Sequence, residues 1–290
     1  MREITFEPTS VTSYTVYEFG EGDGPGVSIT AAVHGDEQTA VHASFLLVKA
    51  IESRNVRGRV KIIPVCNPAA FRNRTRWSPF DGLDLNRIFP GSAEGSPTEQ
   101  LAQSLWQQTR GFGHMIDLHC CGVGGSTYTL ALYEEYPHLR KAAEALGIPV
   151  VVQSGGTSGQ LFVESCRTGQ DALIIELPGG QPGGTIDLQA AEDCCQAVLR
   201  YLIHLGVLEG EASRPPVRFY GKISTLCAPR PGLFLPRAKP GSHCVQGEVL
   251  GTLEEAPVTA PFDGVITTLR QASYCFAGER LAGVAPLEKN

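Results

Sequence analysis

The chain has 290 residues, of which 42% are hydrophobic and 19% are charged, and its formal net charge is −6. This composition is typical of a globular protein with a sizeable core and room for two domains. The negative charge and the lack of Lys/Arg-rich runs argue against nucleic acid or an anionic membrane as the main partner, so we expect a small-molecule partner. The polar start MREITFEPTS and the absence of a long apolar run predict a cytoplasmic protein that does not span a membrane.

Cysteine usage indicates reduced thiols. The nine cysteines are odd in number, and two pairs are adjacent, Cys120-Cys121 and Cys194-Cys195. Without a secretory signal this pattern argues against disulfides, and without a C-x-x-C pair it argues against a thiolate zinc cage. We therefore expect most cysteines to be small buried apolar residues, with Cys120 and Cys121, beside the candidate ligand His119, as candidate exceptions.

The stretch VSITAAVHGDE contains the first candidate site residues. An alternating segment at 13–19 predicts an edge strand, and the apolar run at 27–33 predicts a buried parallel strand. His34 and Glu37 follow at the end of this strand, where open α/β sheets place their chemistry. An imidazole and a carboxylate at this spacing can bind one divalent ion, although a zinc site needs at least one further ligand.

The next elements complete a βαβ unit. Apolar residues recur at helical spacing over 38–54, and β-branched residues at 59–65 predict a strand that ends at Asn67-Pro68. His42 lies on the helix, two turns beyond the strand end, so we interpret it as a core or surface residue and not as a ligand.

A long arginine-rich loop follows, with the sequence AAFRNRTRWSPFDGLDLNRIFPG. It contains Arg72, Arg74, Arg76 and Arg87 between Pro, Gly and Asp residues. A loop longer than about a dozen residues is more often functional than not, although a solvated surface loop is the alternative. Guanidinium groups bind carboxylates through two parallel hydrogen bonds, so Asn86 and Arg87 near a metal suggest recognition of a substrate carboxylate.

A second histidine at a strand end supplies the missing ligand. A helix is predicted at 98–109, and the following apolar strand ends at His119. His34, Glu37 and His119 would leave an open fourth position, which is the pattern of a catalytic zinc site, whereas a lone His119 would be read as a core histidine. His114 begins the same strand and should lie at the opposite end of the sheet, in a structural role.

The remaining elements of this region end with another carboxylate. Strands are predicted at 127–132, 149–153 and 172–177, with helices at 134–146 and 188–206. Glu176 lies at the carboxyl end of its apolar strand. A salt-bridged core residue is one reading, but a buried carboxylate near a metal fits a general base better.

The motifs HGDE, NPAAF, DLNRIFPG, IDLH and IIELPGG, in this order, resemble the succinylglutamate desuccinylase/aspartoacylase family, and the loop SPFDGLDLNRIFPG looks most like the branch that deacetylates N-acetylated diaminobutyrate. The resemblance implies an α/β fold like that of zinc carboxypeptidases, with a mixed sheet and helices on both faces. It implies one Zn²⁺ held by His34, Glu37 and His119. It also implies that Glu176 activates water.

The same resemblance assigns the polar residues of the long loop. Arg87 and Asn86 would bind the substrate carboxylate, and Asp84 would orient His34 through its second ring nitrogen. An arginine of the preceding loop would stabilise the oxyanion; Arg76 is the first choice and Arg74 the second, because the loop has extra residues before DLNR. Arg167 would contact the rest of the substrate.

The last quarter of the chain is rich in β-forming residues and turns and shows little helical periodicity. This predicts a catalytic domain at 1–212 and a β-rich domain at 213–290. The segments VQGEVLGTL and FAGERLAGV match as half-repeats and resemble biotinyl/lipoyl-type barrel-sandwich domains. Lysines are absent between the half-repeats, so we expect no carrier function. In relatives this domain narrows the cleft, which favours a small substrate; Tyr274 is interpreted as a packed aromatic.

These observations lead to the hypothesis of a zinc amidohydrolase that removes an acetyl or succinyl type of acyl group from an N-acylated amino acid or related small carboxylate. Two alternatives stay open, a carboxypeptidase with the same machinery and a non-catalytic metal-binding protein of the same fold. The acyl group, the amine, the oligomeric state and the metal used in the cell do not follow from the sequence.

Overall fold

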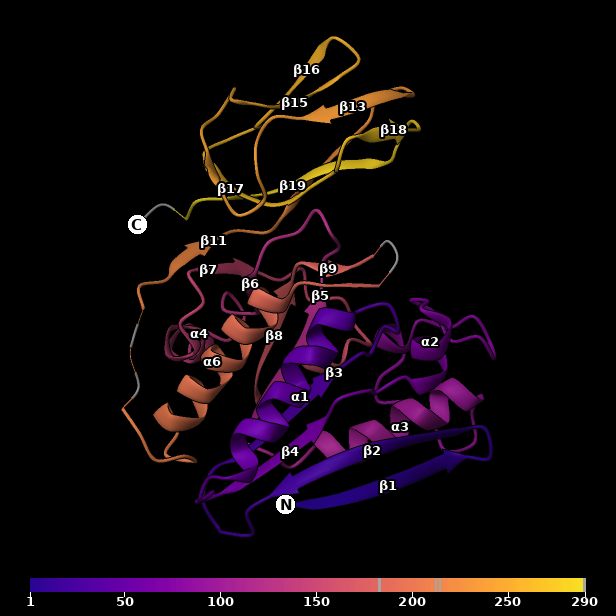
Figure 1. Cartoon of the computed structure of the whole chain (residues 1–290), viewed down its shortest axis with the longest axis vertical. Helices are drawn as coiled ribbons and strands as arrows, with labels where there is room; N and C mark the ends of the chain where they lie inside the picture. Colours follow the sequence, from indigo (N-terminus) through magenta and orange to yellow (C-terminus); the bar gives the residue numbers. More distant parts are fainter. Residues whose placement is uncertain (182–183, 212, 214, 289–290) are drawn as a thin grey trace.

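A nine-stranded mixed sheet forms the centre of the protein in the computed structural model, which describes residues 1–181, 184–211, 213 and 215–288 (Figure 1). The strand order is β1-β2-β4-β3-β5-β8-β6-β7-β11. These strands are β1 (Arg2–Thr9), β2 (Thr12–Phe19), β3 (Gly26–Ala31), β4 (Arg59–Ile63), β5 (His114–Cys120), β6 (Tyr128–Ala131), β7 (Val150–Gln153), β8 (Asp171–Leu177) and β11 (Arg218–Tyr220).

Parallel strands in the middle of the sheet bring the candidate site residues together. β4, β3, β5 and β8 are mutually parallel neighbours, and every residue of β3 is buried. Strands covered on both faces are near-continuous apolar runs, which explains VSITA in β3 and ALIIEL in β8. In register, His119 of β5 pairs with Glu176 of β8, so the two side chains lie at the same edge of the sheet.

Helices cover both faces of the sheet. His114 of β5 contacts the hydroxyl of Tyr201 in α6 at 3.0 Å, whereas Met115 contacts Ser165 in α5, also at 3.0 Å. Successive strand residues point to opposite faces, so α5 and α6 lie on opposite sides of β5. The helices are α1 (Gln38–Glu52), α2 (Pro68–Asn73), the short 3₁₀ helix η1 (Leu85–Arg87), α3 (Pro97–Thr109), α4 (Leu139–Leu146), α5 (Leu161–Arg167) and α6 (Leu188–His204).

Some predicted elements differ from those observed. The strand at 13–19 is not an edge strand, because β1 pairs antiparallel with it and takes the edge. Only residues 139–146 of the helix predicted at 134–146 are helical, since most of residues 134–138 form turns. The short helices α2 and α5 were not predicted; neither is long enough to show a clear helical period.

The C-terminal region forms two four-stranded antiparallel sheets, seen above the main sheet in Figure 1, around a core that includes Phe234, Leu250 and Leu281. This confirms the predicted fold class, an α/β domain with a small all-β part. One sheet consists of β12 (Ser224–Cys227), β19 (Arg280–Pro286), β17 (Gly264–Leu269) and β14 (His243–Cys244), and the other of β16 (Ala256–Thr259), β15 (Val249–Leu253), β13 (Gly232–Pro236) and β18 (Ser273–Cys275).

The two half-repeats form the same turn. Glu248 and Glu279 each accept a hydrogen bond from the backbone N–H three residues earlier, at 3.0 and 3.2 Å. Gly247 and Gly278 precede them with φ of 84° and 85°, a conformation that favours glycine. The Gly-Glu pair therefore marks equivalent turns that lead into β15 and β19.

The connection between the two regions lies partly within the main sheet. β11 follows the predicted boundary at residue 212, yet it pairs in parallel with β7. Its Tyr220 also forms a bridge with Leu287, near the end of the chain. The division at 212/213 stays a prediction, but the first strand after it completes the nine-stranded sheet.

Cysteine state agrees with the sequence prediction, since all nine cysteines are free. Within the described part of the chain, the helices are too short or too polar to span a bilayer.

Candidate metal centre and active site

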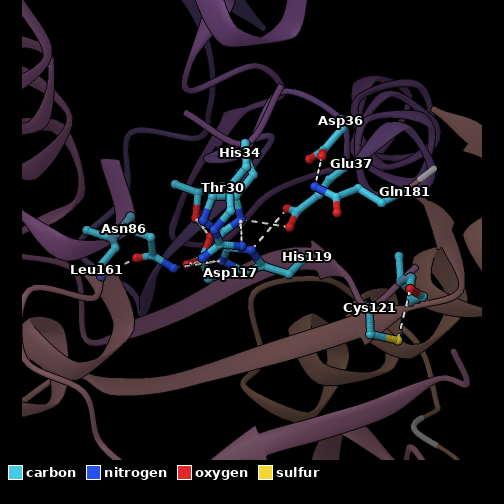
Figure 2. A network of polar contacts seen from close by, with 12 residues as sticks. Thr30, His34, Asp36, Glu37, Asn86, Asp117, His119, Cys121, Leu161 and Gln181 are labelled. Carbon is cyan, nitrogen blue, oxygen red and sulfur yellow. Dashed lines mark hydrogen bonds and ion pairs between the residues drawn. The ribbon is translucent and has the colours of Figure 1, made fainter. Parts of the chain in front are cut away.

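Three side chains from two strand ends converge at the carboxyl edge of the sheet. His34 and Glu37 follow β3, and His119 lies near the end of β5; each is at most 4% exposed. One ligand atom from each lies within 4.8 Å of the others. Figure 2 shows the three side chains pointing toward one another. The structure therefore brings together the three predicted metal ligands.

The turn that carries His34 depends on close packing against α2. A Cβ atom on Gly35 would lie 2.0 Å from the carbonyl carbon of Ala70, so only glycine fits between the turn and the helix. Asn67 caps α2 through its side-chain oxygen, which accepts a hydrogen bond from the N–H of Ala70. The motifs HGDE and NPAAF are thus two sides of one contact.

Carboxylates hold both imidazoles in one orientation. His34 Nε2 is 3.2 Å from Asp84, and His119 Nε2 is 2.9 Å from Asp117. The Nδ1 atoms then face Glu37, at 2.7 Å from His34 and 3.0 Å from His119. A partner on the second ring nitrogen fixes the tautomer and orientation of a metal-binding histidine. The position of Asp84 is as predicted. The role of Asp117 was missed, and its only sequence signal is that it shares a strand face with His119.

Without a metal ion, protons bound to the histidines offset the negative charge of the buried carboxylates. Burial opposes charge on His119, but Asp117 and Glu37 outweigh it and raise the pKa of His119 well above its ordinary value. Burial also favours a neutral Glu37, but the two histidines lower the pKa of this carboxyl to about 2. The cluster thus has a strong affinity for positive charge.

These residues fit a divalent metal ion. Glu37 Oε2 is buried and, among the described residues, makes no hydrogen bond of good geometry. The Nδ1 atoms of both histidines face it. Two imidazoles and one carboxylate form a donor set that suits zinc and other first-row ions.

Glu176 lies beside the ligands, on the wall of the same cavity. It is half-buried, and desolvation raises its pKa to about 7; the charge of Glu37 acts in the same direction and that of His119 opposes it. A carboxyl with a pKa near neutrality can accept and return a proton at physiological pH.

Of the two loop arginines, the structure brings Arg76 to the cavity. Its Nε and Nη2 atoms contact Asp84 Oδ2 at 2.9 and 2.8 Å, and it lines the cavity wall. Arg74 ends α2 in a left-handed conformation, is exposed and does not line the cavity. Asp84 thus connects Arg76 to His34.

Asn86 and Arg87 both line the cavity but differ in their surroundings. The amide of Asn86 is buried, with its oxygen bound to the N–H of Leu161 and its nitrogen 3.4 Å from His119. Arg87 is exposed and donates to the carbonyl of Asn86. The guanidinium of Arg87 therefore remains accessible to an anion, whereas the Asn86 amide connects His119 to α5.

Arg167 is not brought to the other predicted residues. It is exposed and pairs with Glu164 and Ser158 at the far end of α5. The residue before this helix, Gln160, lines the cavity instead. Burial raises the pKa of the Cys120 and Cys121 thiols well above its ordinary value, so these cysteines are not reactive thiolates.

The C-terminal region forms one wall of the cavity, whose volume is about 460 Å³. Its residues could not be chosen from the sequence, because nothing in a β-rich pattern shows which strand faces another domain. Tyr274 is 57% exposed and does not line the cavity, so its interpretation as a packed aromatic was wrong. The residues that do are Ile223, Thr225, Thr267, Thr268 and Arg280.

Comparison with known proteins agrees with this arrangement. The profile of the succinylglutamate desuccinylase/aspartoacylase catalytic domain matches residues 23–205. The chain belongs to this family. Residues 23–205 include the three ligands and Glu176, so the resemblance given by HGDE, IDLH and IIELPGG is confirmed at the level of the family.

Individual members of the family are similar over most of the chain. N-alpha-acetyl-L-2,4-diaminobutyric acid deacetylase of Halomonas elongata is 27% identical over 286 residues, covering 91% of this chain and 83% of that protein. A solved succinylglutamate desuccinylase/aspartoacylase from Rhodobacter sphaeroides is 28% identical with a TM-score of 0.82, covering 96% and 90% of the two chains. An aspartoacylase family protein from Mesorhizobium loti is 25% identical with a TM-score of 0.81 and the same coverage.

Proposed function

We propose that this protein is a zinc-dependent deacylase that hydrolyses the amide of an N-acylated amino acid or a related small carboxylate. The observation that carries the proposal is the convergence of His34, Glu37 and His119 within 4.8 Å of one another on a cavity wall that also contains Glu176. Membership of the family and the similarity to a diaminobutyric acid deacetylase support the reaction class.

His34, Glu37 and His119 would hold the metal through the two Nδ1 atoms and a carboxylate oxygen. A divalent ion in such a site polarises a carbonyl and makes water a better nucleophile at neutral pH. Asp84 and Asp117 keep both imidazoles oriented, so that both Nδ1 atoms already face Glu37.

Glu176 would act as general base and then as general acid. It takes a proton from the attacking water and returns it to the amide nitrogen as that nitrogen departs. Desolvation raises the pKa of this carboxyl, which makes its acid form easier to regenerate for the second step, and a bound cation would favour the ionised form needed for the first.

Two arginines would stabilise negative charge on the substrate. Arg76, held by Asp84, can donate to the carbonyl oxygen as charge develops on it in the tetrahedral transition state. Arg87 is accessible from the cavity and can bind the substrate carboxylate through two N–H groups. The cavity volume of about 460 Å³ suits a substrate the size of an acylated amino acid.

The test combines metal content with release of free amine from N-acetyl and N-succinyl amino acids. Protein purified without added metal should contain close to one zinc per chain, and Glu176→Gln should lower kcat by roughly 10²- to 10⁴-fold. The matched control is Glu192→Gln, an exposed carboxylate on α6 that does not line the cavity, which should leave kcat unchanged. Full metal occupancy without turnover of any acyl amino acid would refute the proposal.

A further inference from the structure

A second hollow lies at the opposite end of the main sheet from the metal centre. Its volume is about 290 Å³, and it is bounded by the start of β1, the end of β2, the start of β4 and the end of α3. Figure 1 shows these elements at the end of the molecule away from the C-terminal sheets. The seven residues of β5 run from this end to His119, which corresponds to about 20 Å. The hollow is therefore separate from the active-site cavity.

Basic side chains dominate the lining of this hollow. Four of its residues are cations and one is an anion, namely Arg2, Arg59, Lys61, Arg110 and Glu18. The chain as a whole carries a net charge of −6, so this end of the sheet departs from the average in sign. A concave surface lined by charges of one sign raises the local concentration of the opposite ion.

The single carboxylate is shared between two of the cations. Glu18 lies opposite Arg2 on one neighbouring strand and opposite Lys61 on the other, and it contacts them at 2.7 and 3.1 Å. Arg2 also has the exposed Glu21 at 3.8 Å. The side chains of Arg59 and Arg110 line the hollow as well.

Neither of these two arginines has a polar partner. Among the described residues, the guanidinium groups of Arg59 and Arg110 make no ion pair and no hydrogen bond, and both side chains are exposed. Each group therefore keeps its N–H donors available to a ligand, in the planar arrangement that suits a phosphate or a carboxylate.

Packing holds the cations of β4 in place. Arg59 and Lys61 both lie over the ring of Phe112, at 5.4 and 5.5 Å from its centroid. The Lys61 ammonium also donates to Gln108 Oε1 at 2.9 Å, and its side chain is only 14% exposed. Two cations held over one ring repel each other. An anion beside them would remove this repulsion and would find groups that are already ordered, which lowers the entropic cost of binding.

Two negative features oppose an anion in the hollow. One is Glu18, and the other is the carboxyl end of the 13-residue helix α3, which carries about half a negative charge. Four cations exceed both together. A solvated surface would account for one exposed arginine, but it does not account for a hollow that stays positive after Glu18 and the helix end are included.

We propose that this hollow binds a small anion with at least two negative charges, either a phosphate monoester or a compact polycarboxylate. Both classes place several acceptor oxygens close together, which two guanidinium groups and an ammonium group can bind at once. A volume of about 290 Å³ is close to the lower limit for ligand pockets, so the anion is small. This site is independent of the proposed deacylase function.

Calorimetric titration with glycerol 2-phosphate and with tricarballylate, in about 0.1 M KCl, tests the proposal and distinguishes the two sources. At least one of them should bind with one site per chain and a dissociation constant below about 1 mM, and the tighter of the two names the class. Acetate and glycerol, which lack the second charge or any charge, should bind at least tenfold more weakly. Zinc-loaded and chelator-treated protein should give the same result, because the hollow lies far from the metal ligands.

Replacement of the two unpaired arginines locates the binding. Arg59→Gln/Arg110→Gln should weaken the tighter anion by about tenfold or more. The matched control is Arg54→Gln/Arg230→Gln, which removes the same charge from two exposed arginines outside the hollow and should leave the dissociation constant within about twofold. Arg59→Gln and Arg110→Gln alone should each weaken binding by about threefold, so the test holds even if the double variant does not fold.

Three results would overturn the proposal. The first is that neither anion binds more tightly than acetate. The second is an equal loss of affinity in the two double variants, which would mean that the anions respond only to the overall surface charge. The third is binding that requires zinc, since the anion would then occupy the metal centre and not this hollow.

Discussion

Replacement of Glu176 by glutamine should stabilise the metal-free protein while it removes catalysis. Desolvation raises the pKa of Glu176 to about 7 from 4.5, so ionisation of this carboxyl is harder in the folded state than in the unfolded state. The unfolded chain therefore releases its proton at lower pH, and the wild type loses stability as the pH rises from the unfolded-state pKa to the folded-state pKa. Glutamine has nearly the same shape and does not ionise.

The size of the pKa shift of Glu176 determines how much more stable Glu176→Gln should be than the wild type. A difference of about 2.5 pK units corresponds to roughly 3 kcal/mol in the free energy of unfolding once the carboxyl is fully ionised. Because Glu176 is half-buried and faces the cavity, solvent screening reduces this, and we expect about 2 kcal/mol. Glu176→Gln should gain this amount over the wild type at about pH 8.5, and less than about 0.5 kcal/mol at about pH 4.5.

Urea denaturation in the presence of a chelator, at both pH values, measures the difference. Added zinc should reduce the difference in unfolding free energy between the wild type and Glu176→Gln at high pH, because a nearby cation stabilises the ionised carboxylate. Glu192→Gln controls for the loss of an exposed negative charge. Equal stabilities of the wild type and Glu176→Gln at both pH values would refute the reasoning from desolvation.

Three further predictions concern the ligands and the arginines. Asp117→Asn should weaken zinc affinity by roughly 10- to 100-fold in a chelator competition, because His119 loses the partner that orients it; unchanged affinity would contradict this. Zinc affinity should fall as the pH decreases, since the raised pKa of His119 means that protons compete with the metal, and a flat titration between about pH 8 and pH 6 would argue against it. Arg87→Lys should raise KM about tenfold with little change in kcat, whereas Arg167→Gln should leave KM within about twofold. The opposite pattern in steady-state kinetics would show that Arg167, and not Arg87, contacts the substrate.

The metal ligands were predictable because their positions follow from backbone topology. The carboxyl ends of parallel strands meet at one edge of a sheet, so His34, Glu37 and His119 had to come close once β3 and β5 were recognised as buried parallel strands. Glu176 follows from the same argument, as it ends the neighbouring strand β8. The family motifs added the roles of these residues, which strand geometry alone does not supply.

The residues that sequence reasoning missed depend on contacts between distant segments. Asp117 is an acidic residue inside a buried strand, and only its neighbours Thr30 and His119 explain it. Asp36 stands in the most visible motif of the chain and lines the cavity, but its partner Gln181 comes from another loop. No pattern within one segment reports such pairings. The pairing of Arg167 with Glu164 is local, but it was missed because the short helix α5 was not predicted.

The attachment of the C-terminal β-structure has a consequence for how this family can diversify. The segment enters at Tyr220 and returns to it at Leu287, so its two ends are joined at one edge of the main sheet. All three metal ligands and Glu176 precede the point of entry. Sequence changes within the segment would therefore alter one wall of the cavity and the size of the molecules it accepts, while the metal ligands and Glu176 lie outside it.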